Sequence, residues 1–220
     1  RTRAIFLASP ANPTGAVQPR EVVEELSQLG IPILSDEIYD GLTYDGAEVA
    51  SPLGFTENCY VLDGFSKRYA MTGFRLGYVI APLASIRTLQ ILQQNLFISA
   101  NHFVQHAGIA ALREGEETVR RMRIAYDHRR RLLVDGLRQL GFGVPELPRG
   151  AFYVLADARV FGSDSRQLAF DLLERSGVAA TPGIDFGEAG EGFLRFCYAA
   201  AEEEIVEALE WLAPVLRELA

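Results

Sequence analysis

The sequence predicts an α/β protein in which a mainly parallel sheet with flanking helices is followed by a small α+β domain. In the first third of the chain, short continuous apolar runs alternate with helical or loop segments. This alternation is typical of parallel strands whose sheet is covered on both faces. In the last third, two strand-like runs and two amphipathic segments follow a long helix, which indicates a second, smaller unit.

Four strands are expected in the first third of the chain. Each is an apolar run that ends in turn-forming or polar residues. The expected strands are residues 4–7, 31–34, 60–64 and 76–80. Between the first two strands, Pro19 is well placed for the first turn of a helix that stops at Gly30.

The remainder of the chain is mostly helical by pattern. Apolar residues recur at helical spacing over residues 83–97, 101–112 and 116–140. In the last part, the expected strands are residues 151–156 and 193–198, and the expected helices are residues 165–176 and 201–219. Pro214 should bend the final helix.

The composition is that of an ordinary globular protein. The chain has 220 residues, of which 49% are hydrophobic and 23% charged, and its net charge is −8. This acidic balance without a basic tract argues against nucleic acid or an anionic membrane surface as a partner. No apolar run approaches the roughly 18 residues of a membrane span. The chain begins at Arg1 with a strand directly behind it, so we expect a piece of a longer protein without a signal peptide.

Cysteines and histidines do not indicate a disulfide or metal protein. Cys59 and Cys197 are too few for a disulfide framework, so we expect buried, reduced thiols in a cytoplasmic protein. His102 and His106 have a spacing that can bind metal on a helix, but no acidic neighbour completes a site. The run Arg129–Arg131 is typical of a solvated helix face.

Polar side chains gather at the strand ends, which is where an open α/β sheet places its ligands. In chain order they are Asn12, Asp36, Tyr39, Ser66, Lys67 and Arg75. Together they provide an amide, a carboxylate, a phenol, a hydroxyl, an amine and a guanidinium. Lys67 is the only lysine among the 21 basic residues.

Pyridoxal phosphate is a ligand that uses all six of these groups. Its aldehyde needs an amine to hold it as a Schiff base, and among side chains lysine supplies one. Its ring nitrogen needs a carboxylate that keeps it protonated, and its phosphate needs hydroxyl and guanidinium donors. A phenol and an amide can bond the ring oxygen. The residue types therefore predict a pyridoxal phosphate site.

Three segments resemble the signature blocks of the class I and II aminotransferases, which are fold-type I pyridoxal-phosphate enzymes. They are NPTG at residues 12–15, DEIY at residues 36–39 and SKRYAMTGFRLG at residues 66–77. The blocks occur in the family's order, and Arg195 follows them in Leu194-Arg195-Phe196 ahead of the last helix. One tetrapeptide alone is a weak signal, whereas three ordered blocks and the arginine are specific.

The resemblance implies a role for each matching residue. Lys67 would be the catalytic residue and would form the aldimine with the cofactor. The other cofactor contacts would be Asp36 to the ring nitrogen, Asn12 and Tyr39 to the ring oxygen, and Ser66 and Arg75 to the phosphate. Arg195, with Asn12, would bind the substrate's α-carboxylate. We expect Arg195 to point away from Leu194 and Phe196, and the Asn12–Pro13 peptide bond to be cis.

The implied function is pyridoxal-phosphate-dependent transamination between an amino acid and a 2-oxo acid by a cytoplasmic homodimer, with no nucleic acid, membrane or metal partner. Residues 1–115 would form the second half of the cofactor-binding large domain, residues 116–140 a long connecting helix, and residues 141–220 the small carboxyl-terminal domain. Because the family also uses strands ahead of the first block, we expect this chain to be inactive alone.

Two other functions share the same cofactor residues. One is a pyridoxal-phosphate-dependent lyase or decarboxylase of the same fold. The other is an aminotransferase-like domain that holds the cofactor as an effector in a transcription regulator. The two are separated from a transaminase by the product, because only a transaminase converts the amino acid to an oxo acid and leaves the amino group on the cofactor.

Overall fold

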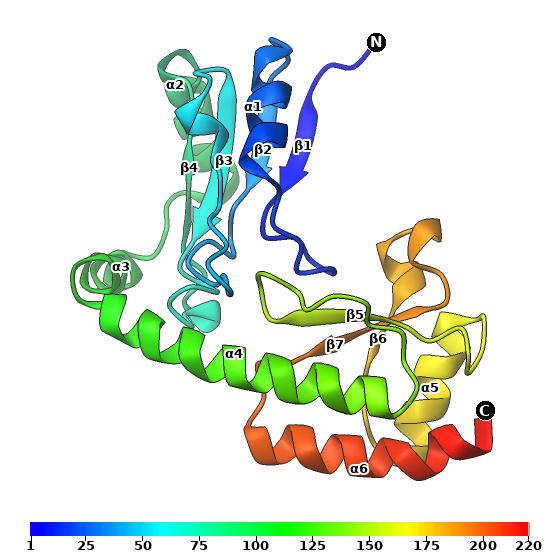
Figure 1. Cartoon of the computed structure of the whole chain (residues 1–220). Helices are drawn as coiled ribbons and strands as arrows, with labels where there is room; N and C mark the ends of the chain where they lie inside the picture. The colour runs from blue at the N-terminus through cyan, green and yellow to red at the C-terminus, as the bar shows by residue number, and fades with distance from the viewer. Residues whose placement is uncertain (220) are drawn as a thin grey trace. The chain divides into compact units, whose positions relative to one another are not determined.

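The computed structural model describes residues 1–219 and divides the chain into two compact units (Figure 1). The first unit comprises Arg1–Ala11 and Ala16–Arg123, and the second comprises Asn12–Gly15 and Ile124–Ala220. Each unit is built around its own sheet, and each is described by itself.

The first unit holds a four-stranded sheet in the order β1-β2-β3-β4. Its strands are β1 (Ile5–Ala8), β2 (Ile33–Asp36), β3 (Cys59–Gly64) and β4 (Gly77–Ile80). The first three are parallel, and β4 pairs antiparallel with β3. A parallel neighbour needs a long crossover, usually a helix, whereas the segment between β3 and β4 contains only a short 3-10 turn, Thr72–Phe74. The expected mainly parallel α/β sheet is therefore confirmed, with an antiparallel edge.

One face of this sheet packs against α1 (Arg20–Gln28). Val23 of α1 is fully buried together with Leu7, Ile33 and Cys59 from the three parallel strands. This packing explains why the strands are short apolar runs. The helix begins after Pro19, as expected from the sequence.

The other helices of the first unit are α2 (Leu83–Phe97) and α3 (His102–Glu114). Every residue of β4 is exposed, and α2 has no buried residue. The expectation that the sheet is covered on both faces is therefore wrong for the described residues. Large apolar side chains remain exposed on the edge strand and on the helix after it, such as Ile80 of β4 and Phe97 of α2, although an apolar run by itself indicates burial.

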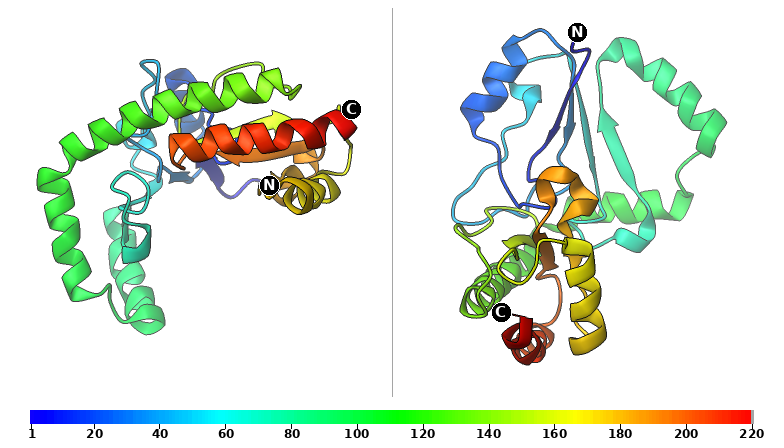
Figure 2. Two further views of the ribbon diagram at one scale, coloured as in Figure 1. Left: turned by 90° about the horizontal axis from the view of Figure 1, so that it is seen from below. Right: turned by 90° about the vertical axis from the view of Figure 1, so that its right-hand side faces the viewer.

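Helix α4 (Glu116–Gln139) crosses from the first unit into the second. The second unit contains the antiparallel sheet β5-β7-β6, made of β5 (Tyr153–Asp157), β7 (Phe193–Cys197) and β6 (Thr181–Pro182). The sheet is packed with α5 (Ser165–Ser176) and α6 (Glu202–Leu219). Figure 2 shows α4 running beside α6. The two helices approach so closely that a Cβ at Gly136 would meet Leu209.

Alternation along β7 decides which side chains enter the core of the second unit. Leu194 and Phe196 are buried, whereas Arg195 is half-buried and Cys197 is exposed. The orientation expected for Arg195 is confirmed. The expectation of two buried thiols holds for Cys59 but is wrong for Cys197, because Cys197 follows the buried Phe196 and faces the opposite side.

The interpretation of Arg129–Arg131 as a solvated face is wrong for Arg130, which is fully buried. Arg130 lies three, four and seven positions before Leu133, Val134 and Leu137, which are also buried. Residues at these spacings share one helix face, so Arg130 faces the core.

Two further findings limit the classes of site. Within residues 1–219, no helix has both the length and the apolar character needed to span a membrane. The same residues contain no group of three or more His, Cys, Asp or Glu side chains arranged to hold a metal ion.

Candidate functional site

The strand register brings five of the expected site residues to one edge of the first unit's sheet. Ala8 of β1 pairs with Asp36 of β2, and Asp36 pairs with Leu62 of β3. Strands β1 and β2 therefore end side by side at Ala8 and Asp36, and β3 continues past Leu62 to Gly64. Gly64 of β3 pairs with Gly77 of β4, so the antiparallel strand starts at this same edge. The residues at or next to this edge are Asp36, Tyr39, Ser66, Lys67 and Arg75.

The turn after β2 orients Asp36 and Tyr39. The Asp36 Oδ1 atom accepts a hydrogen bond from the Ile38 backbone N–H at 3.1 Å, which fixes the carboxylate against its own chain. Asp36 is half-buried, and Tyr39 is almost completely buried at 5% exposure. A carboxylate and a phenol three residues apart are thus held by one short turn.

The segment after β3 forms a compact turn that carries Ser66 and Lys67. The Phe65 carbonyl accepts hydrogen bonds from the backbone N–H groups of Tyr69 and Met71, at 3.3 and 3.2 Å. The Ser66 carbonyl accepts a further one from the Thr72 hydroxyl at 2.9 Å. Lys67 is half-buried within this turn, so its amine lies on a constrained backbone.

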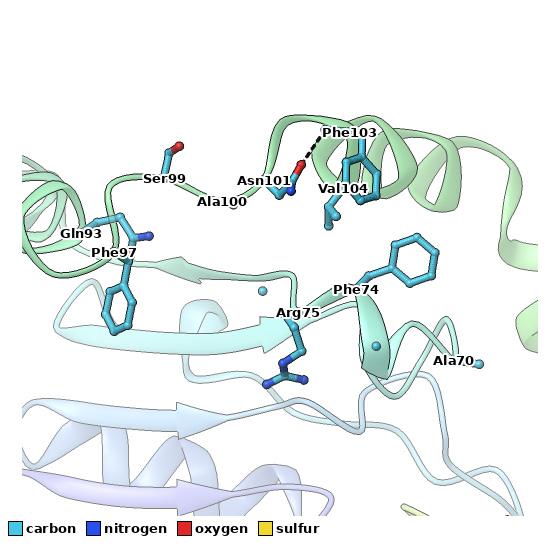
Figure 3. A pocket seen from close by; sticks show the side chains of 12 residues that line it. Ala70, Phe74, Arg75, Gln93, Phe97, Ser99, Ala100, Asn101, Phe103 and Val104 are labelled. Carbon is cyan, nitrogen blue, oxygen red and sulfur yellow. Dashed lines mark hydrogen bonds between the residues drawn. The ribbon is translucent and has the colours of Figure 1, made fainter.

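Arg75 ends this segment in a left-handed conformation with φ of 55°. Its Nη1 donates to the Thr72 carbonyl at 2.8 Å, and its side chain is exposed. Arg75 lines a cavity of about 1030 Å³ together with Phe74, Phe97 and Asn101. In Figure 3 its guanidinium points away from Asn101. A cavity with a guanidinium as its only cationic lining group suits an anionic ligand.

Arg68, beside Lys67, is a residue that the sequence reasoning did not single out. Its guanidinium forms ion pairs with Asp40 at 3.1 Å and with Glu116 at 3.4 Å. It also lies against Gly41, where an added Cβ would be 2.9 Å from the Arg68 Nε atom. Arg68 therefore joins the turn that follows Tyr39 to the turn that carries Lys67. Its position next to Lys67 was the only sequence signal.

Buried carboxyl groups surround this edge. Burial raises the pKa of Glu37, which is only 7% exposed, although hydrogen bonds from Ser35 and Ser51 act in the opposite direction. Burial likewise raises the pKa of Asp63, whose Oδ2 accepts a hydrogen bond from the Tyr78 hydroxyl at 2.7 Å. Both carboxyl groups therefore hold their protons to a higher pH than usual.

Asn12 and Arg195 both lie in the second unit, where the structure brings them together across 183 residues of sequence. Arg195 Nη1 donates to Asn12 Oδ1 at 2.7 Å, and Arg195 Nη2 donates to Thr181 Oγ1 at 3.0 Å. The peptide bond between Asn12 and Pro13 is cis, as expected.

Two aromatic rings hold the Arg195 guanidinium. Its central carbon lies 4.2 Å from the ring centre of Tyr153 and 5.0 Å from that of Phe186. Among the described residues, its partners are an amide, a hydroxyl and these two rings, and none is a carboxylate. Two of the five N–H donors of the guanidinium bind Asn12 and Thr181, so others are left for a ligand carboxylate.

The donor set of the first unit fits pyridoxal phosphate. The edge provides an amine for the aldehyde, a carboxylate for the ring nitrogen and a buried phenol for the ring oxygen. The hydroxyl of Ser66, and the exposed guanidinium of Arg75 that lines the cavity, suit the phosphate. The tyrosine, threonine and phenylalanine around Arg195 were missed by sequence reasoning, because only the register between distant strands places them there.

Comparison with known proteins shows the family to which the chain belongs. A family model described as aminotransferase class I and II matches residues 1–212. A (5-formylfuran-3-yl)methyl phosphate transaminase of Methanocaldococcus jannaschii is 43% identical over 96% of this chain and 56% of its own length. An aspartate/prephenate aminotransferase of Thermus thermophilus is 40% identical over 98% of this chain and 57% of its own length. The chain thus spans little more than half the length of these curated relatives.

Solved structures show the same fold. An aromatic aminotransferase from Pyrococcus horikoshii superposes with a TM-score of 0.94 at 37% identity, covering 99% of this chain and 61% of the other. An aspartate aminotransferase from Thermus thermophilus with maleate superposes with a TM-score of 0.90 at 40% identity, covering 98% and 57%.

Proposed function

The chain belongs to the class I and II aminotransferases, and we propose that the enzyme containing it transfers an amino group between an amino acid and a 2-oxo acid with pyridoxal phosphate. The observation that carries the proposal is the edge of the first unit's sheet, where strand register gathers an amine, a carboxylate, a phenol, a hydroxyl and a guanidinium. The family is one that uses this cofactor, and the donor set matches its reactive groups one for one.

The residues of the first unit would hold the cofactor. Lys67 would bind its aldehyde, Asp36 would keep its ring nitrogen protonated, and Tyr39 would donate to its ring oxygen. Ser66 and Arg75 would bind its phosphate. When bound, the cofactor supplies an electron sink that stabilises negative charge at the substrate's Cα. Lys67, once displaced by the substrate amine, would then carry the proton between Cα and the cofactor's C4′.

The second unit would supply the substrate contacts. Arg195 presents a planar fork, whose central carbon lies over the rings of Tyr153 and Phe186, and its two hydrogen bonds to Asn12 and Thr181 restrict its orientation. A fixed fork binds a carboxylate through two parallel hydrogen bonds, which orients the bond to be broken at Cα. Asn12 would contact the cofactor ring oxygen. Its hydrogen bond with Arg195 would also help to position the guanidinium that binds the substrate.

The finer expectations are also part of this proposal. The complete enzyme would act as a cytoplasmic homodimer on an amino acid and a 2-oxo acid. Residues 1–115 would belong to the large domain, residues 116–140 to the connecting helix and residues 141–220 to the small domain. The names of the relatives, which include aspartate and aromatic aminotransferases, support an amino-acid substrate of one of these classes.

A labelling experiment tests the central assignment. Borohydride reduction of the cofactor-loaded enzyme should fix the cofactor on the peptide that contains Lys67, the only lysine of this chain. Lys67→Ala should abolish that label and the conversion of amino acid to oxo acid, while Arg68→Ala, at the adjacent position, should keep the label. Turnover of Lys67→Ala at a tenth of wild type, or carbon dioxide release in place of oxo acid, would contradict the proposal.

A further inference from the structure

Arg130 of α4 is fully buried in the second unit, yet no step of the proposed function uses it. Its neighbour Arg131 is half exposed, as expected on a solvated helix. Arg130 Nη2 lies 2.5 Å from Asp127 Oδ1, and Arg130 Nη1 donates to the Pro148 carbonyl at 2.6 Å. A buried guanidinium costs free energy unless it is paired and hydrogen-bonded, so both contacts are needed for its position.

The Pro148 carbonyl, which accepts a hydrogen bond from Arg130, belongs to a loop that is itself hydrogen-bonded to Gly15. The backbone N–H groups of Arg149 and Gly150 both donate to the Gly15 carbonyl, at 3.1 and 2.8 Å. Gly15 has φ of +68°, and a Cβ there would stand 2.5 Å from the Pro148 Cβ atom. The two segments are therefore in close contact, and a shift of one forces a shift of the other.

Gly15 in turn lies three residues from Asn12, whose Oδ1 accepts the hydrogen bond from Arg195. The far end of the same loop is also fixed, because the fully buried Tyr198 donates its hydroxyl proton to the Ala151 carbonyl at 3.1 Å. A continuous series of contacts thus leads from Arg130, through the loop and Gly15, to the amide that faces Arg195.

We propose that Arg130, oriented by Asp127, is a positioning residue for substrate binding: by fixing the Pro148 carbonyl it places Asn12 against Arg195 and sets the orientation of that guanidinium. The inference rests on the proposed function, because it assigns Arg195 to the substrate's carboxylate. Loss of Arg130 leaves the Pro148 carbonyl buried without its donor, so the loop and Gly15 move and the amide of Asn12 leaves its position.

The test measures binding of two unreactive carboxylates, maleate and 3-phenylpropionate, to the cofactor-loaded enzyme. For the analogue that wild type binds more tightly, Arg130→Met should raise the dissociation constant about tenfold or more. The KM for the amino acid should rise more than kcat falls, and cofactor content should stay at the wild-type level. Arg130→Lys keeps a cation that can reach one partner but not both, so its dissociation constant should be intermediate.

Arg120→Met is the matched control. Arg120 belongs to the same helix and forms the same three-residue-spaced ion pair, with Glu117 at 2.7 Å, but both side chains are exposed. Its dissociation constant should stay within about twofold of wild type. An equal increase in this variant would mean that any lost ion pair on α4 weakens binding, and would overturn the inference.

An unchanged dissociation constant in Arg130→Met overturns the inference. If Arg130→Met does not fold, Asp127→Asn decides: a raised constant supports the inference, and an unchanged one overturns it. A wild-type enzyme that binds neither analogue and does not transaminate contradicts the proposed function itself. If the wild-type enzyme binds an analogue and transaminates, and the Arg130 variants do so equally well, only the positioning role has failed.

Discussion

Replacement of Arg195 by lysine tests the substrate role most directly. The arginine donates from one nitrogen to Asn12 and from another to Thr181, and its central carbon lies over the rings of Tyr153 and Phe186. Lysine keeps the positive charge but carries it on a single nitrogen. It can neither span both oxygen partners nor reproduce the contact of a planar guanidinium with the two rings.

The size of the effect follows from these contacts. Losing one of the two charge-assisted hydrogen bonds that the fork would donate to the substrate's carboxylate costs about 1.5–3 kcal/mol, and losing the ring contacts adds about 0.5–1 kcal/mol. The sum is roughly 2–4 kcal/mol, and at about 1.4 kcal/mol per tenfold this lowers kcat/KM by roughly 30-fold to 1000-fold. Most of the change should appear in KM, because the lost bonds hold the carboxylate before the reaction begins.

The assay is steady-state transamination, with cofactor content and the midpoint of thermal unfolding measured on the same samples. Arg159→Lys is the matched control, since Arg159 also stacks on an aromatic ring, Phe193 at 5.4 Å, and pairs with Asp157, but its side chain is 63% exposed. It should leave KM unchanged. A wild-type KM in Arg195→Lys, or a parallel loss of cofactor and thermal midpoint, would refute the assignment to the substrate's carboxylate.

Three further changes have defined outcomes. Asp36→Ala should lower kcat by about two powers of ten or more while borohydride still labels Lys67, and unchanged turnover would show that the carboxylate only stabilises its turn. Gly15→Ala should destabilise the protein by about 1 kcal/mol or more in denaturant unfolding, because of its positive φ and the contact with Pro148, whereas Gly30→Ala, with the same φ but open space, should cost less. Because burial raises the pKa of Glu37, the stability that this carboxyl contributes is present when it is protonated and is lost as pH rises through the raised pKa. Glu37→Gln should therefore remove that part of the pH dependence. The free energy of unfolding of the variant, relative to wild type, should be higher at pH 7 than at pH 4. Equal differences at the two pH values would contradict this sign.

Local signals in the sequence predicted the helices well. The helix expected at residues 83–97 and that at 165–176 have the same bounds in the structure. For the second, the cause is visible in its ends: Asp164 accepts a hydrogen bond from the Gln167 N–H at 2.9 Å, and Gly177 ends the helix with a left-handed φ of 75°. Such caps lie within a few residues of the helix, so a single sequence contains them.

Strand pairing was predicted less well, because it depends on partners far along the chain. The two-residue strand β6 was missed, since a threonine followed by a proline resembles a loop. The direction of β4 was not predicted, because an apolar run has the same composition in either direction. The burial of Arg130 was missed for a related reason: three consecutive arginines suggest a solvated face, and only the spacing to the apolar residues that follow indicates which of the three points inward.

The residues of the candidate site also fall into two groups: those that local sequence signals predicted and those that depend on strand pairing. Groups at a strand end or within the next few residues, such as Asp36 and Lys67, could be predicted from sequence because the sheet edge orders them. The surroundings of Arg195 could not, because β7 lies between two strands that are distant in sequence: Leu155 and Thr181 both pair with Arg195, and that register brings Tyr153 and Thr181 onto its face of the sheet. Since two hydrogen bonds and the ring contacts position the guanidinium, binding of the α-carboxylate, which every amino-acid substrate carries, depends on these register-dependent neighbours. Variants of Tyr153 and Thr181 should therefore raise KM for different amino acids by a similar factor, whereas variants at the strand ends, which act through the cofactor, should mainly lower kcat.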